Sequence, residues 1–159
     1  MVREFVFDQS YTQQPEGRFN ISSPQPIKFD SLSIPQASLV FSDIEFSTLV
    51  LKGQMKDGDI AISELTLGSA KNDLFIQARG GVTVSFTKTG TRLSRYDLQM
   101  RLIRSSNLVK KDQFIANSLD FLFDDSKAKI TENAQGKTYQ FRMRGLSRGM
   151  PQLTPLAQF

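Results

Sequence analysis

Some of the carboxylates of the chain come in pairs, and pairs of acids are one arrangement that supports general acid and base chemistry. Asp57 lies two residues before Asp59, and Asp124 adjoins Asp125 close to Asp120. The chain has no histidine and no cysteine, so it lacks the commonest general base, the usual partner of a nucleophilic serine and any thiolate nucleophile. Acids in turns and at helix ends are ordinarily solvated. We therefore expect no catalytic residues and a protein that is not an enzyme.

Metal and nucleotide motifs are equally unsupported. The composition excludes a zinc site built from thiolates or imidazoles, and Asp57-Gly58-Asp59 lacks the spaced ligand set of a calcium-binding EF-hand loop. The glycines at 80–81 and 145–149 form neither a GxGxxG nor a P-loop lysine motif. We expect no metal and no cofactor.

Positive charge is spread along the chain, which carries 20 Lys and Arg residues against 16 Asp and Glu, a formal net charge of +4. The densest basic group comprises Arg142, Arg144 and Arg148. It fits the solvent-exposed side of a final strand better than a phosphate site, because half-exposed strands alternate in this way. We therefore expect no nucleic-acid partner.

No segment approaches the roughly 20 continuous apolar residues of a membrane-spanning helix. No apolar signal-peptide core follows Met1–Glu4 either. As it stands the chain reads as soluble, and the alternative that an export or anchor segment precedes it stays open.

The elements that must position any site are mainly strands. Residues 1–37 are polar and rich in proline, and proline cannot donate to a sheet ladder, so the strand-like pieces at 17–21 and 27–29 belong at sheet edges or in loops covering an edge. From residue 38 the β-branched and aromatic residues of a sheet begin. We predict an irregular N-terminal segment over 1–37 and a β-rich region over 38–159, together one domain.

Two hairpins organise the β-rich region. Asp57-Gly58 between apolar runs indicates a type I′ turn that places Met55 opposite Ile60. Beyond it the apolar residues change parity, which predicts either a bulge near Ser63-Glu64 or a strand buried on both faces. A second hairpin turns at residues 87–90, and the adjacent glycines at 80–81 indicate a bend, a bulge or a close backbone approach in a curved sheet.

One helix is expected between about residues 106 and 123, with Ser105 or Ser106 as its cap and Asp112 as a second start if the helix is broken. A last strand covers 137–144, and Gly145 and Pro151 end regular structure. Sequential hairpins with one helix and no βαβ spacing predict a mainly β fold, a curved antiparallel sheet in the form of an open trough or partial barrel with one covering helix.

Two predicted strands alternate apolar and polar residues clearly enough to propose the lining of an apolar groove. Exposed apolar area beyond a few hundred Å² normally marks a binding site, and the alternative role for the same side chains is contact with the helix. The candidate lining residues are Tyr96, Leu98, Met100, Leu102, Tyr139, Phe141 and Met143.

The pattern over residues 58–156 resembles the C-terminal periplasmic region of the type II secretion system protein N family (GspN). The segments that carry the resemblance are GDIAISELTLGSAKNDLFIQARGGVTVSF, TRLSRYDLQMRLI and GKTYQFRMRGLSRGMPQLTPL. Within them the matching positions are Leu67-Gly68, Gly81-Val82, Asp97-Leu98, Arg101 and 145–151. The motifs are short and largely structural, and residues before 38 do not align.

The resemblance implies a relative of the AsmA-type envelope proteins, whose strands form an open trough that holds lipid in some members. It implies a periplasmic location, an inner-membrane anchor outside this chain, and an accessory role in protein export together with other secretion-system components. Phospholipid is the alternative partner, in a lipid-binding trough unrelated to secretion. The resemblance carries no catalytic residues, and Gly81, Asp97 and Gly145 are expected to serve structure.

Overall fold

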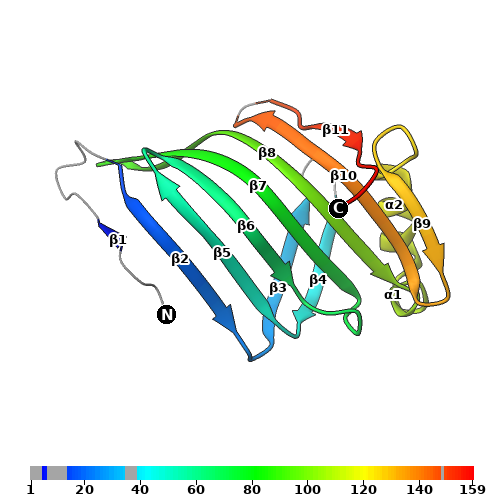
Figure 1. Ribbon diagram of the computed structural model, residues 1–159. Coiled ribbons are helices and arrows are strands. Elements are labelled where there is room, and N and C mark those ends of the chain that lie inside the picture. The colour runs from blue at the N-terminus through cyan, green and yellow to red at the C-terminus, as the bar shows by residue number, and fades with distance from the viewer. Residues whose placement is uncertain (1–4, 7–13, 35–38, 148) are drawn as a thin grey trace.

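The protein is described by a computed structural model that covers residues 5–6, 14–34, 39–147 and 149–159. One large antiparallel sheet, with strand order β1-β2-β5-β6-β7-β8-β10-β11, dominates it, and β9 pairs with β10 beside β11. The sheet curves and does not close into a barrel (Figure 1). Its strands are β1 (Phe5–Val6), β2 (Glu16–Ser23), β5 (Leu49–Lys56), β6 (Asp59–Leu67), β7 (Leu74–Thr87), β8 (Gly90–Ser105), β9 (Lys129–Asn133), β10 (Gly136–Leu146) and β11 (Gln152–Pro155).

A separate hairpin and two helices pack on one face of this sheet. The hairpin consists of β3 (Ile27–Ile34) and β4 (Leu39–Phe46), and the helices are α1 (Ser106–Lys111) and α2 (Gln113–Leu122). In Figure 1 all four elements lie behind the sheet. The mainly β fold with a curved, open antiparallel sheet is thus confirmed.

The single helix predicted from the sequence is divided in two at Asp112. The Asp112 carboxylate accepts a hydrogen bond from the Ile115 backbone N–H at 3.0 Å and so caps α2, whereas the Ser105 hydroxyl caps α1 by accepting from Leu108 at 3.2 Å. A side-chain oxygen that satisfies a free N–H favours a helix start at its own position. The start signal at Asp112 was therefore a real second helix start.

The strand register separates the sheet into an apolar and a polar face, because side chains that are paired across neighbouring strands point the same way. The apolar face carries Phe19, Leu51, Ile60, Ile62, Leu65, Leu74, Ile76, Val82, Tyr96, Leu98, Met100, Leu102, Tyr139, Phe141 and Met143. The polar face carries Gln54, Asp59, Thr83, Arg79, Asp97, Gln99, Arg101, Gln140, Arg142 and Arg144. The hairpin and helices cover only part of the apolar face.

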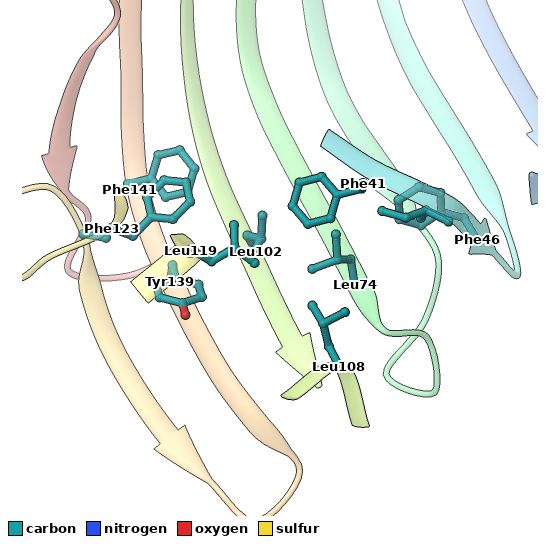
Figure 2. Packing of buried hydrophobic residues seen from close by; sticks show 11 residues of the cluster. Phe41, Phe46, Leu74, Leu102, Leu108, Leu119, Phe123, Tyr139 and Phe141 are labelled. Atoms are coloured by element: carbon teal, nitrogen blue, oxygen red, sulfur yellow. The ribbon is translucent and has the colours of Figure 1, made fainter. Parts of the chain in front are cut away.

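The core forms where that cover meets the sheet. Phe41 and Phe46 come from β4, Leu119 from α2, and Leu74 and Leu102 from the sheet, and all are almost completely buried (Figure 2). At the other side of the core the Phe123 ring lies 4.6 Å from the Phe141 ring and 5.3 Å from the Tyr139 ring, centroid to centroid. These contacts hold the helices on β8 and β10.

The turn and the bulge predicted around β6 are both present. Asp57 and Gly58 have φ values of 52° and 83°, as a type I′ turn requires, and Met55 pairs with Ile60 across it. The register on both sides of β6 shifts between Ile62 and Leu65, so one extra residue is accommodated there. The bulge keeps Ile62 and Leu65 on the apolar face although they are three positions apart.

Strands near the two ends of the chain are longer or more numerous than predicted. The strands expected at 17–21 and 27–29 extend over β2 and β3, and β2 pairs with β5 from Gly17 to Ser23. Residues 1–37 thus contain strands, as expected, but longer ones. Residues 1–4, 7–13 and 35–37 lie outside the described residues, and the division after residue 37 stays a prediction. The short strands β9 and β11 were missed, because neither shows a clear apolar alternation.

Gly80 and Gly81 provide a direct test of how closely the sheet strands approach. Gly80 has φ +140°, and a Cβ built there would lie 2.2 Å from the Asp97 carbonyl oxygen, whereas one at Gly81 would meet nothing nearer than 4.0 Å. We predict that Gly80→Ala lowers the free energy of unfolding by about 1–3 kcal/mol, since only glycine tolerates this conformation. Gly81→Ala should change it by less than about 0.5 kcal/mol. Urea unfolding of both variants measures the difference, and equal losses would contradict the close approach at Gly80.

Candidate functional site

One acid of each pair that suggested chemistry is engaged in local contacts. Asp59 accepts a hydrogen bond from the Thr83 hydroxyl at 2.6 Å, and Asp57 occupies the β5–β6 turn. Hydrogen bonds from Lys127 and Ser126 lower the pKa of Asp124 to about 2. Within the described ranges, no group of three or more acidic side chains gathers in a way that could hold a metal ion. Asp59 and Asp124 are thus held by local hydrogen bonds.

A partly buried polar cluster that the sequence did not single out surrounds Asp120. The Arg104 side chain, from a residue only 4% exposed, places Nη2 3.3 Å from both Asp120 carboxylate oxygens. Lys137 Nζ lies 2.9 Å from the same carboxylate, and the Tyr139 hydroxyl donates to it while accepting from Arg104 Nε at 3.3 Å. The cluster joins α2 to β8 and β10.

The protonation states in this cluster follow from its contacts. Burial by itself would raise the pKa of Asp120, but hydrogen bonds from Tyr139 and Lys137 and the charge of Arg104 outweigh it, so the pKa lies below its ordinary value. Burial raises the pKa of the Tyr139 hydroxyl, and the hydrogen bond to Asp120 adds to that shift. Asp120 is therefore ionised and Tyr139 neutral at neutral pH. This arrangement suits a structural ion-pair cluster that fastens the helix.

The seven predicted groove residues are brought together on the apolar face. Across β8 and β10, Leu102 pairs with Tyr139, Met100 with Phe141, and Leu98 with Met143, while Tyr96 pairs with Gly145. The seven do not share one environment, however. Some lie in the covered core, and the others lie at its margin or on the uncovered part of the face.

Three of the seven do not line a groove. Leu102, Tyr139 and Phe141 are 6%, 0% and 3% exposed, because α2 and Phe123 cover them. Contact with the helices, the alternative role considered for them, is the one that the structure shows. Met100 and Met143 are half-buried at the margin of the same core.

Tyr96 and Leu98 belong to a wider surface beyond the core, which we call the distal apolar face. Among the described residues, its members are half-buried and lie outside the cluster that packs with the hairpin and helices. They are Phe19, Leu51, Ile60, Ile62, Val82, Val84, Tyr96 and Leu98. The contributions of β2, β5, β6 and β7 were missed because alternation within one strand does not reveal which strand lies beside it.

Gly81, Asp97 and Gly145, three of the positions that match the family pattern, have structural contacts. On the polar face Asp97 accepts hydrogen bonds from Arg142 Nε at 2.6 Å and Nη2 at 2.7 Å. A Cβ at Gly145 would lie 2.4 Å from the Tyr96 hydroxyl oxygen, so the tyrosine ring occupies the space above this glycine. Gly81 pairs with Asp97 on the neighbouring strand. Each serves strand packing.

The candidate site is accordingly a surface of the sheet, with the helices at its margin. Neither helix in the described part of the chain has both the length and the apolar character needed to cross a membrane. Comparison of the chain with models of protein families, with curated proteins and with solved structures finds no match.

Proposed function

We propose that the protein is a non-enzymatic domain that binds lipid acyl chains on the distal apolar face. The observation that carries this proposal is that the apolar face continues past the hairpin and helices that cover its other part. Full burial of an aliphatic or aromatic side chain is favourable by about 1.5–3 kcal/mol relative to its exposure to water. Several half-buried side chains on one open surface therefore leave a large stabilisation to be gained by an apolar ligand.

The shape of the surface suits a linear ligand. Ile60, Val82 and Tyr96 are paired in a row across three neighbouring strands. With strands about 4.8 Å apart, such a row spans about 10 Å. A second row runs beside it through Ile62 and Leu98. Parallel apolar rows without intervening charges favour extended hydrocarbon chains over polar ligands.

The resemblance to the type II secretion system protein N family supports a cellular setting for this activity. An open, curved antiparallel sheet agrees with the AsmA-type trough that the resemblance implies. On this basis the domain is a periplasmic, inner-membrane-associated accessory component of protein export. The alternative is a lipid-binding trough with no part in secretion.

A second candidate function is contact with other secretion components. The observation that favours it is the outward side of α2, where Phe114 and Phe121 are 74% and 86% exposed. They are seven residues apart and hence lie on the same side of the helix. Large exposed apolar groups of this kind often mark interfaces with other proteins.

The acyl-binding proposal is tested with two neighbouring residues whose side chains point to opposite faces. Leu98→Asp introduces a charge into the distal apolar face, and Gln99→Asp introduces the same charge on the polar face. We expect wild-type protein to co-purify with phospholipid and to bind a fluorescent fatty-acid probe. Leu98→Asp should weaken probe binding about tenfold or more, because it removes one apolar contact and requires a carboxylate to be desolvated when the probe binds. Gln99→Asp should bind the probe as the wild type does.

Mass spectrometry of extracted lipid and titration of the probe measure these effects, and circular dichroism checks that both variants are folded. Wild-type protein that carries no lipid and does not bind the probe would leave protein contact as the surviving function.

A further inference from the structure

The polar face of the sheet contains a hollow of about 1030 Å³ at the end of the sheet that carries the β5–β6 turn. Its floor is formed by Ala61 and Gly81, which pair with each other on β6 and β7. A Cβ at Gly81 would point into open space. The hollow arises because these two residues are small and the residues around them carry long side chains. The volume lies at the upper end of the range for small-molecule sites.

One wall of the hollow is basic and is held in place by an ion-pair cluster. Asp97 receives two hydrogen bonds from Arg142 and one from Arg144 Nε at 3.1 Å. The hydrogen bond from Arg142 keeps the pKa of Asp97 low, so one negative charge faces two guanidinium groups. Within the described part of the chain, the terminal nitrogens of Arg144 have no further partner, and Arg95 beside it has no ion-pair or hydrogen-bond partner.

The opposite wall of the hollow is mainly acidic. Asp57 and Asp59 come from the β5–β6 turn, together with Lys56. Asp59 is engaged by Thr83. Arg148, the third member of the basic group noted in the sequence, lies outside the described residues. The free positive charge is therefore concentrated on the β8–β10 side.

The rim on that same side is apolar. Leu146 and Met150, which line the hollow beside Arg144, are 66% and 86% exposed. Arg95 and the terminal nitrogens of Arg144, which is already paired with Asp97 through Nε, thus lie next to exposed aliphatic side chains. This combination binds a lipid interface, where the cations meet phosphates and the apolar groups enter the acyl boundary.

We propose that this hollow is a docking site for the phosphate group of an anionic phospholipid at a membrane surface. Arg95 and Arg144 bind the phosphate oxygens, for which the guanidinium geometry is well matched. Leu146 and Met150 enter the bilayer surface, and Asp97 and Arg142 hold Arg144 in place. The charged side chains of the site lie on the opposite face from the acyl-binding surface, although Ile60, Val82 and Tyr96 border both.

Flotation with vesicles of phosphatidylcholine, with and without phosphatidylglycerol, tests the proposal. Wild-type protein should float with the anionic vesicles, and Arg95→Ser and Arg144→Gln should each weaken binding about fivefold. The double substitution Leu146→Ser, Met150→Ser should weaken it about tenfold. As a matched control, Phe114→Ser with Phe121→Ser removes two equally exposed apolar groups elsewhere and should leave binding unchanged.

A further variant separates a built site from general attraction between charges. Gly81→Gln fills the floor without altering charge or rim, and it should weaken anionic vesicle binding while circular dichroism shows an unchanged fold. Unchanged binding by Gly81→Gln, equal flotation with neutral vesicles, or loss of binding only in the phenylalanine control would overturn the proposal. So would binding of millimolar inorganic phosphate by a protein that does not float. Probe binding at Leu98 is measured separately, so the two proposals can fail independently.

Discussion

Phe123→Ala is expected to lower the free energy of unfolding by about 3–5 kcal/mol, the usual loss when a large buried aromatic ring is removed. Phe123 is 5% exposed, and its ring is stacked on Phe141 and in contact with Tyr139. The cavity would open between the end of α2 and the sheet, beside the Phe141 and Tyr139 rings. Denaturant unfolding monitored by circular dichroism gives the loss directly.

Phe121 is the matched control for this substitution. It is the same residue type two positions earlier in the chain, but it is 86% exposed. Phe121→Ala should therefore change stability by less than about 0.5 kcal/mol. Comparable losses for the two variants would mean that α2 is rotated relative to its described position, and the assignment of its buried side would be wrong.

Asp120→Ala is expected to cost about 3–5 kcal/mol, because it leaves Arg104 as a buried charge without its carboxylate. The Arg104 side chain is 5% exposed, and Asp120 is the acid with which it pairs. Arg104→Met in the Asp120→Ala background should recover a large part of the loss, since a charge without a partner is then replaced by an apolar side chain. A double variant no more stable than Asp120→Ala would contradict this account.

The pH dependence of the same pair has a defined sign. The folded-state pKa of Asp120 is depressed, so its contribution to stability is present above the unfolded-state pKa of about 3.9 and is lost as the pH falls through the folded-state value. The stability difference between wild type and Asp120→Ala should therefore be constant near neutral pH and shrink below about pH 4. A difference that grows on acidification would indicate that Asp120 is protonated in the folded protein.

Local chemistry was sufficient to predict several elements from the sequence. Asp57-Gly58 specified the β5–β6 turn because two consecutive positive φ values are best tolerated by these residue types. The change of parity between Ile62 and Leu65 predicted the bulge, because side chains of a strand alternate with period two. Alternation in β8 and β10 likewise predicted which side chains share a face.

Long-range pairing decided what alternation could not. Leu98 and Leu102 have the same residue type and the same parity, yet one is half-buried and the other is covered by the helices. The difference arises from where the chain between β8 and β9 folds back. Asp120 similarly resembled an ordinary helical acid until Arg104, Lys137 and Tyr139 were brought to it from β8 and β10.

The sequence by itself determined the fold class, the turns and the two-sided character of the strands, since these depend on neighbouring residues and on the period of the backbone. Only the tertiary structure decided which part of the apolar face is uncovered and that Arg95 and Arg144 border a hollow above Gly81. Both features depend on the order of strands from β5 to β10 and on the places of the covering elements. Contacts between distant segments determine that order, and no local pattern records it.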